Sequence, residues 1–439
     1  MYEIPMQALR VLQKMEENGF EAYLVGGCVR DLLRGERPQD WDMTTSARPE
    51  QMLAMFDGYA IPTGLQHGTV TVRENGCSFE ITTYRVDGEY EDHRHPDCVT
   101  FTDRLAEDLK RRDFTVNAMA MDRRGNVTDL YGGKEDLEKR VIRCVGDARK
   151  RFDEDALRIL RAIRFSATLG FAPEEETGRA VHELAPLLHS VTAERIREEL
   201  LKLLCGKNVV QVLLDYPDVL GVFLPEILPA VGCDQHNCHH CYDVWEHIVR
   251  TVGYIAPEKV LRMTMLLHDL GKPACMTLDE DGVGHFKGHA DQSCEMGREI
   301  LKRLRFDRES TDRILALVKW HDAPIEPTER AMRRVLNKMT PEGARELLQV
   351  KRADNLAQAP AYLGRQEEID RLEALLQAAV EQDACFSLKQ LAVNGYDLME
   401  RGYCGKEIGQ GLHFLLNAVM DGKLPNEKET LLAALRRKE

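Results

Sequence analysis

The sequence predicts an α+β protein of several domains, with an α/β amino-terminal part and a helical remainder. Short apolar runs rich in β-branched residues alternate with helical segments over about the first 140 residues. From Leu137 onward the apolar spacing is helical and is interrupted at glycines and prolines such as Gly170 and Pro186. The length of 439 residues is sufficient for about three domains.

Local patterns give the elements of the amino-terminal part. Leu9, Leu12 and Met15 are spaced as on one helix face, and Asn18-Gly19 is a turn before the next apolar run. Asn75-Gly76 is typical of a hairpin turn between two alternating strands. In chain order, we predict a helix at 7–18, a strand at 22–25, a helix start at 28–34, a strand at 40–45, and hairpin strands at 68–72 and 78–84.

Charge and hydropathy exclude several classes of protein. The chain has 59 Lys and Arg against 73 Asp and Glu, a formal net charge of −14, which excludes a uniformly basic coat for nucleic acid. No long apolar window predicts a membrane span, and the charged, amphipathic amino terminus is unlike a signal peptide, so we expect a soluble cytoplasmic protein. The stretch 104–164 nevertheless has 16 Lys and Arg against 12 Asp and Glu, a local basic region typical of phosphate binding.

Twelve cysteines are scattered along the chain and predict reduced thiols rather than a disulfide framework. One cluster allows two interpretations, a zinc site or a reduced, partly buried loop. No second CxxC pair stands at a finger-like distance, which favours the loop. The cluster consists of Cys233, Cys238 and Cys241 with His236, His239 and His240.

The first chemical motif runs from the strand at 22–25 to Asp42. Gly26 and Gly27 let the backbone approach a triphosphate closely, and Arg30 adds a positive fork. Asp40 and Asp42 stand two apart on a predicted strand, so both carboxylates face the same way and are suited to hold Mg²⁺ ions that bridge nucleotide phosphates. A lone Asp-x-Asp is usually a solvated turn, but the combination predicts two-metal nucleotidyl transfer.

Gly26-Gly27-x-Val29-Arg30-Asp31 with Asp40-x-Asp42 resembles the polymerase-beta-like nucleotidyltransferases, specifically the class II CCA-adding tRNA nucleotidyltransferase and poly(A) polymerase family. The resemblance implies a third catalytic carboxylate on a strand. Glu80 is the best-placed candidate because Thr82 and Tyr84 share its strand face. An ordinary exposed glutamate of an edge strand is the alternative interpretation.

The second motif combines two segments, residues 111–117 and residues 154–164. Its three-residue step predicts a stripe along one side of a helix, and a solvated arginine face is the alternative. An Asp that accepts and an Arg that donates match the Watson–Crick edges of C and A but mispair with U and G. Asp155 and Arg158 meet this requirement one turn apart. The residues of the stripe are Asp155, Arg158, Arg161 and Arg164.

This stretch resembles the family's nucleotide-selecting motif, in which protein side chains replace a nucleic-acid template. The resemblance implies that Arg112, Arg161 and Arg164 contact the nucleotide or its phosphates, and that Asp113 and Asn117 recognise the ribose. The segment 85–96 resembles the family's flexible loop, which CC-only relatives lack. It therefore favours a full CCA-adding or an A-adding enzyme.

The third motif is an ordered series of histidines and aspartates that resembles HD-superfamily phosphohydrolases. Imidazole and carboxylate ligands together favour Mn, Fe, Co, Ni or Zn over Mg alone, with a bridging hydroxide attacking phosphorus. The activity that the resemblance implies is hydrolysis of 2′,3′-cyclic or terminal phosphates on RNA ends. The alternative interpretation is a vestigial helical scaffold that binds no metal. The implied ligands of one or two metals are His247, His268, Asp269, His289, His321 and Asp354.

Together these motifs predict an enzyme that adds C, C and A to the 3′ end of tRNA from CTP and ATP and releases pyrophosphate. The alternatives are an A-adding or poly(A) polymerase, an HD phosphohydrolase with an inactive RNA-binding head, and a non-catalytic tRNA-binding module. The oligomeric state stays open. The predicted domains are a nucleotidyltransferase head at 1–140, a helical neck and body at 141–235, an HD domain at 236–384, and a helical tail at 385–439 in which Lys406 contacts the acceptor arm.

Overall fold

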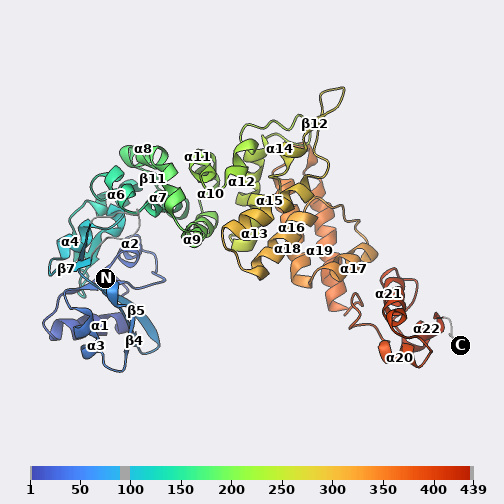
Figure 1. Cartoon of the computed structure of the whole chain (residues 1–439), viewed down its shortest axis with the longest axis horizontal. Coiled ribbons are helices and arrows are strands. Elements are labelled where there is room, and N and C mark those ends of the chain that lie inside the picture. The colour runs from blue at the N-terminus through green and yellow to red at the C-terminus, as the bar shows by residue number, and fades with distance from the viewer. Residues whose placement is uncertain (1, 89–98, 436–439) are drawn as a thin grey trace. The chain divides into compact units, whose positions relative to one another are not determined.

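The computed structural model describes residues 2–88 and 99–435 and divides into two compact units, Met1–Leu228 and Pro229–Glu439. In Figure 1 the first unit runs from blue to green and the second from green to red. Residues 89–98, which include most of the flexible loop predicted at 85–96, lie outside the described residues. No helix among the described residues is long and apolar enough to cross a membrane.

A seven-stranded sheet forms the core of the first unit, in the order β3-β4-β5-β2-β1-β8-β9. Only β2 and β5 pair in parallel, and the other neighbours are antiparallel. A separate ladder joins β6 (Arg85–Asp87) to β7 (Val99–Phe101). The sheet strands are β1 (Ala22–Val25), β2 (Met43–Thr45), β3 (Ala60–Gly64), β4 (Thr69–Glu74), β5 (Cys77–Thr83), β8 (Met119–Met121) and β9 (Val127–Asp129).

Amphipathic helices cover this sheet because their apolar faces match its buried side. Val11, Leu12 and Met15 of α1 are buried in one cluster with Leu24 of β1 and Ile81 of β5. The sheet and α1 confirm the predicted helix at 7–18, strand at 22–25 and hairpin. The helices around the sheet are α1 (Met6–Glu17), α2 (Gly27–Leu33), α3 (Pro49–Met55), α4 (Leu105–Lys110) and α5 (Gly133–Lys139), with 3-10 turns at Leu65–His67 and Thr115–Asn117.

One part of the strand predicted at 40–45 is wrong. β2 begins only at Met43, so Asp40 and Asp42 lie in the connection that precedes the strand. The backbone N–H of Val25 still donates to the carbonyl oxygen of Asp42 at 3.0 Å, which ties this connection to the end of β1. The two carboxylates are therefore positioned by the end of β1 and the start of β2 rather than by strand alternation.

The rest of the first unit is helical apart from a short parallel ladder between β10 (Val141–Ile142) and β11 (Ala172–Pro173). The prediction of purely helical structure after about residue 140 is wrong at this ladder. The helices are α6 (Ala148–Glu154), α7 (Leu157–Leu169), α8 (Glu175–Glu183), α9 (Ala193–Leu204), α10 (Val209–Asp215) and α11 (Pro217–Gly221), with 3-10 turns at Ala185–Ser190 and Pro225–Ala230.

The second unit is a helical assembly with one small hairpin, β12 (Thr277–Leu278) and β13 (Gly284–His285). A separate apolar cluster, which includes Leu398, Leu415 and Leu431, forms the core of its carboxy-terminal part. The helices are α12 (Val244–Tyr254), α13 (Lys259–Leu267), α14 (Lys272–Cys275), α15 (His289–Arg303), α16 (Arg308–Trp320), α17 (Glu329–Lys338), α18 (Pro341–Leu356), α19 (Arg365–Glu381), α20 (Gly395–Met399), α21 (Lys406–Met420) and α22 (Lys428–Ala433), with a 3-10 turn at Pro360–Tyr362.

Candidate active sites

Three carboxylates meet at one recess of the first unit. Asp40, Asp42 and Glu80 all line it, and all three are exposed. Parallel pairing places Met43 opposite Ile81 and Thr44 opposite Thr82, so the preceding residues, Asp42 and Glu80, are also neighbours. The carboxylates that the sequence separates by about 40 residues are thus brought together by one strand pair.

Their electrostatics fit a cation. Desolvation by the surrounding protein raises the pKa of Asp42, and the Glu80 carboxylate raises it further. Arg112 acts in the opposite direction, and Asp40 adds a smaller increase. Three carboxylates crowded in this way repel one another, and a hard divalent cation relieves that repulsion while accepting their oxygen ligands.

Gly26 lies directly beside this group. Its φ of +71° is a conformation that L side chains rarely adopt, and a Cβ there would contact Nη1 of Arg112 at 3.4 Å and Oδ2 of Asp42 at 3.8 Å. Gly27 follows as the first residue of α2. A residue without a side chain thus leaves space on one side of Asp42, where we expect the triphosphate to bind.

Arg30 is more constrained than a free fork. Only 9% of it is exposed, and it donates to Asn117 at 2.8 Å and to Asp31 at 2.9 Å. Asn117 in turn donates to Asp113 at 3.2 Å. The predicted triphosphate residue and the predicted ribose residues therefore form one hydrogen-bonded chain.

Asp108 holds Arg112 in place and is a residue that the sequence motifs missed. Its side chain is fully buried and accepts from Arg112 at 3.1 Å, from Arg111 at 2.7 Å and from the hydroxyl of Thr44 at 3.2 Å. Burial alone would raise the pKa of Asp108, but Arg112 and Arg111 lower it below its ordinary value. The Nε of Arg112 is buried without a hydrogen-bond partner in the described structure, as expected of a group that awaits an anion.

Asp113 pairs with Arg161 rather than facing solvent. Its Oδ2 accepts from Nη2 of Arg161 at 2.6 Å and from Nε at 2.9 Å. Although burial opposes ionisation, Arg161 outweighs it and lowers the pKa of Asp113 to about 2. Arg164 forms an analogous pair with Glu199 at 2.8 Å. These arginines are oriented by carboxylates of the protein itself.

The proposed template pair is arranged differently from the helical stripe that the spacing predicts. Asp155 has extended backbone, with φ −140° and ψ 102°, and follows α6, whereas α7 begins at Leu157. Asp155 pairs with Arg195 at 2.9 Å, and Arg158 pairs with Glu154 at 2.8 Å. The single continuous helical face is therefore wrong, because the chain breaks between α6 and α7.

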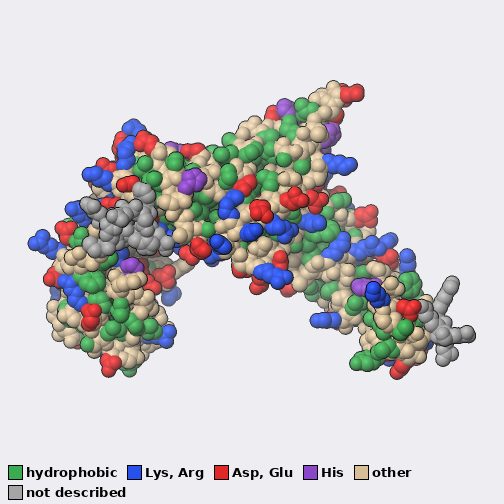
Figure 2. Space-filling view, in the orientation of Figure 1, with side chains coloured by type: hydrophobic (Ala, Val, Ile, Leu, Met, Phe, Trp, Pro, Cys, Tyr) green, Lys and Arg blue, Asp and Glu red, His purple; other side chains and the backbone are tan. Residues whose placement is uncertain are grey.

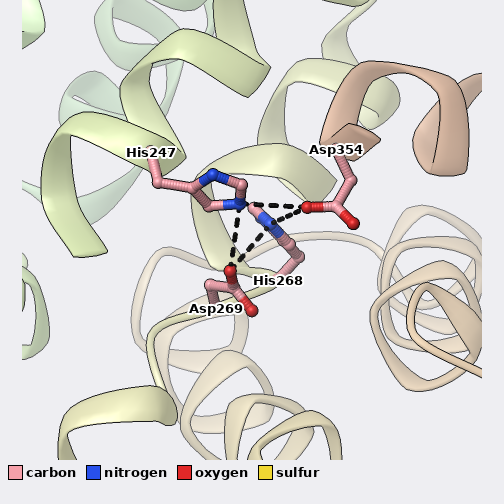
Figure 3. A group of neighbouring side chains, drawn as sticks. All are labelled: His247, His268, Asp269 and Asp354. Atoms are coloured by element: carbon pink, nitrogen blue, oxygen red, sulfur yellow. Dashed lines mark hydrogen bonds and ion pairs between the residues drawn. The ribbon is translucent and has the colours of Figure 1, made fainter. Parts of the chain in front are cut away.

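The six histidine and aspartate residues predicted in the second unit do converge. His247 lies on α12, Asp354 on α18, and His289 is the first residue of α15. His268 and Asp269 directly follow α13, and His321 directly follows α16. Figure 3 shows four of them pointing toward one centre from three separate segments. Helices far apart in the sequence thus supply one cluster.

The cluster contains two groups whose ligand atoms lie within 4.8 Å of one another, and Asp269 belongs to both. In the first group, Nε2 of His247 lies 2.9 Å from Oδ1 of Asp354 and 3.3 Å from Oδ2 of Asp269, and Nε2 of His268 lies 3.2 Å from the same Oδ2. In the second, Nε2 of His289 and of His321 lie 3.3 and 3.5 Å from Oδ1 of Asp269.

Backbone carbonyls orient the imidazoles. A carbonyl oxygen can only accept, so each Nδ1 donates to its carbonyl and each Nε2 is left facing the carboxylates. This arrangement is typical of histidines that bind metal. The Nδ1 partners are the carbonyls of Met265 for His268 (2.7 Å), Phe286 for His289 (2.8 Å), Val318 for His321 (2.7 Å) and Ala357 for His247 (3.3 Å).

The donor set passes a test for a divalent cation. Nε2 of His268 and Oδ1 of Asp269 are buried without a hydrogen-bond partner in the described structure. Burial lowers the pKa of His268, but Asp269 and Asp354 outweigh it and raise that pKa to about 10. The negative charge of these two carboxylates, which keeps the proton on His268, also attracts a cation. Binding of the cation would release that proton.

Lys272 and His240 border this cluster and were not among the predicted ligands. Lys272 is buried, forms an ion pair with Oδ2 of Asp269 at 2.7 Å and donates a hydrogen bond to Gln235 at 2.9 Å. Burial lowers the pKa of His240 to about 3, with Lys272 adding to the effect. The cysteine and histidine loop at 233–241 thus contributes His240 and His239 to the recess around the cluster, and none of its three cysteines belongs to either ligand group in the described structure.

The sheet and its carboxylates define the class of protein as a nucleotidyltransferase, and family models agree. Residues 22–143 match the poly A polymerase head domain, and residues 170–230 match the probable RNA and SrmB-binding site of polymerase A. Residues 288–435 match the putative domain 2 of tRNA nucleotidyltransferase. Together, the three matched segments cover parts of both compact units.

The CCA-adding enzyme of Geobacillus thermodenitrificans is 34% identical over 436 residues, which are 98% of this chain and 96% of that enzyme. The enzyme of Lactobacillus delbrueckii subsp. bulgaricus is 54% identical over 231 residues, so the chain matches little more than half, 57%, of its length. The Bacillus stearothermophilus CCA-adding enzyme, solved in complex with CTP, is 31% identical over 97% of this chain and 95% of that one, with a TM-score of 0.74. The chain belongs to the family of CCA-adding enzymes.

Proposed function

We propose that this chain adds C, C and A to the 3′ end of tRNA, using CTP and ATP and releasing pyrophosphate. The observation that carries the proposal is the convergence of Asp40, Asp42 and Glu80 beside Gly26 and Arg112. The full-length relative is a CCA-adding enzyme, and solved relatives include complexes with CTP, with ATP and with tRNA. For this reaction on tRNA we propose a cytoplasmic location.

The carboxylates would hold divalent cations, for which we propose Mg²⁺. When bound, such cations activate an attacking hydroxyl and neutralise charge on the departing pyrophosphate. Gly26 leaves room for the triphosphate, and Arg112 supplies fixed positive charge beside it, held by Asp108. The tRNA 3′-hydroxyl would be the nucleophile, so the protein contributes position and charge rather than a covalent intermediate.

For base selection we propose the residues of the second motif. Asp155 would accept from the exocyclic amino group of C or A, and Arg158 would donate to the neighbouring ring nitrogen. Arg161 and Arg164 would contact the nucleotide. Asp113 and Asn117, already joined by a hydrogen bond, would recognise the ribose.

Incorporation of labelled nucleotides into a tRNA transcript that ends at the discriminator base tests this proposal. Supplied with CTP alone, the protein should add two residues, and with CTP and ATP together it should add three. Addition of A without any C would instead identify the A-adding or poly(A)-type alternative. Asp40→Ala and Asp42→Ala should each abolish addition, and addition that persists would refute the metal assignment.

As a second function we propose metal-dependent phosphohydrolysis in the second unit, favoured by the convergence of five further ligands on Asp269. A transition metal such as Mn, Co, Ni or Zn suits the mixed imidazole and carboxylate set. RNA ending in a 2′,3′-cyclic phosphate, incubated with the protein and each metal, is the test substrate. Asp269→Ala should abolish hydrolysis and leave CCA addition intact, whereas Asp40→Ala should have the opposite effect.

A further inference from the structure

A recess of about 720 Å³ lies on one side of the three head carboxylates. Besides Asp40, Asp42 and Glu80, its lining includes Arg37, Gln39 and Trp41. A volume of this size falls in the range of ligand sites in proteins. The recess therefore offers room for a second substrate next to the metal-binding carboxylates.

The carboxylates separate this recess from the proposed triphosphate residues. Oδ2 of Asp42 is the atom that a Cβ on Gly26 would approach, and Nη1 of Arg112 flanks the same glycine. Neither Gly26, Arg30 nor Arg112 lines the recess. Asp42 thus has one side toward the glycine turn and another toward the recess.

In-line displacement at phosphorus requires the nucleophile and the leaving group to stand on opposite sides of the reacting atom. Pyrophosphate leaves on the side of Gly26 and Arg112 in the proposed function, on which the present inference rests. The attacking 3′-hydroxyl must then approach from the other side of the carboxylates. The recess is the space that the described structure provides there.

We propose that Arg37 positions the acceptor RNA by contacting a backbone phosphate of its single-stranded 3′ end in the recess. Arg37 is exposed, and its guanidinium has no carboxylate partner in the described parts of the chain. It is also the only Lys or Arg among the described residues of this lining. A phosphodiester beside three carboxylates needs such a charge, and Trp41 adds an aromatic surface of the kind on which bases stack.

The neighbouring polar residues support RNA rather than a second nucleoside triphosphate. One arginine balances the single negative charge of a phosphodiester, whereas a triphosphate carries several charges and would meet the three carboxylates without further cations. Gln39 and Gln7 line the same recess and offer neutral donors and acceptors for sugar and base groups. The charge of the lining therefore selects the acceptor strand.

The test compares Arg37→Gln, Arg37→Lys and a matched control, Arg124→Gln, in the full chain. Arg124 is exposed between β8 and β9, at the opposite edge of the sheet from β3 and β4. For each variant we would measure kcat, the KM for CTP and the KM for tRNA ending at the discriminator base. The Kd for the same tRNA would be measured without nucleotide at several salt concentrations, and thermal unfolding would verify the fold.

We expect Arg37→Gln to raise both the KM and the Kd for tRNA about tenfold and to leave the KM for CTP within about twofold. The slope of log Kd against log salt should fall by about 0.7, the value for one phosphate contact to a single strand. Arg37→Lys should restore most of the binding, and Arg124→Gln should match the unchanged protein.

Two results would overturn the proposal. An unchanged Kd for tRNA in Arg37→Gln would show that Arg37 does not contact the acceptor end. An equal rise in the KM for CTP would place Arg37 on the nucleotide side. Failure of the proposed function is distinct, because the unsubstituted protein would then add no nucleotide, while the Kd of the variants would still report whether Arg37 binds the acceptor.

Discussion

Asp108 accepts a hydrogen bond from Arg112 at 3.1 Å while its own side chain is fully shielded from solvent. Because Nη1 of Arg112 faces Gly26 beside Asp42, a buried carboxylate on α4 determines where positive charge lies beside the carboxylates proposed to bind metal. Asp108 acts through Arg112 and is therefore a positioning residue.

Asp108→Asn should lower kcat/KM for CTP by one to two orders of magnitude. It should also cost about 2 kcal/mol of unfolding free energy, since charged hydrogen bonds to Arg111 and Arg112 are weakened. Steady-state kinetics and urea unfolding measure the two effects. Asp103→Asn, which removes an exposed ion pair with Arg48, is the matched control. It should change neither the activation free energy derived from kcat/KM nor the free energy of unfolding by more than about 1 kcal/mol. A normal kcat/KM in Asp108→Asn would contradict the positioning role.

Asp155→Ala and Arg158→Ala should relax or destroy the choice of C and A more than they unfold the protein. The reason is that each removes half of the donor and acceptor pattern that mispairs with U and G. Misincorporation of UTP and GTP into tRNA, expressed as kcat/KM relative to CTP, should rise at least about tenfold. Discrimination that stays intact in both variants would disprove the template assignment.

Arg195→Met separates position from chemistry in the same site. It removes the ion pair that holds Asp155 at 2.9 Å but retains the carboxylate. We expect a loss of discrimination smaller than in Asp155→Ala, measured by the same misincorporation ratio. An effect as large as that of Asp155→Ala would mean that the carboxylate works only when Arg195 holds it.

The stability of the first unit should depend on pH through Asp113. Its pKa is lowered to about 2 in the folded chain, chiefly by Arg161, from an ordinary value near 3.8. A depressed pKa contributes stability that is present above the unfolded value and is lost as pH falls through the folded one. The unfolding free energy of the unsubstituted protein should exceed that of Asp113→Asn by about 2 kcal/mol at pH 6, and the difference should shrink from pH 4 to pH 2. A difference independent of pH would contradict the ion-pair explanation.

The sharing of Asp269 predicts how metal stoichiometry responds to substitution. Elemental analysis after metal loading should find up to two ions in the unsubstituted protein, none in Asp269→Ala, and no more than one in His289→Ala. Thermal unfolding should show metal-dependent stabilisation that follows the same order. His413→Ala, an exposed histidine on α21, is the control and should bind as the unsubstituted protein does. Full occupancy in Asp269→Ala would refute the bridging role.

Neither unit presents a single basic face in the space-filling view. Figure 2 shows Lys and Arg interspersed with Asp and Glu on the face drawn. This agrees with the formal net charge of −14.

The sequence by itself determined the fold class, the strand and helix elements of the head, and the residue types of both sites. It could do so because Gly26-Gly27 with Asp40-x-Asp42 and the histidine and aspartate series are local patterns with a direct chemical meaning. The family of CCA-adding enzymes is confirmed by the full-length relative.

Only the tertiary structure decided which side chains meet. The neighbourhood of Asp42 and Glu80 depends on the parallel pairing of β2 with β5, and no local spacing encodes a long-range register. The break at Asp155 arises where α6 ends, so the three-residue step did not form a continuous stripe. Asp108 and Lys272 stayed outside the motifs for the same reason: a buried charge gains its role from partners that folding brings to it.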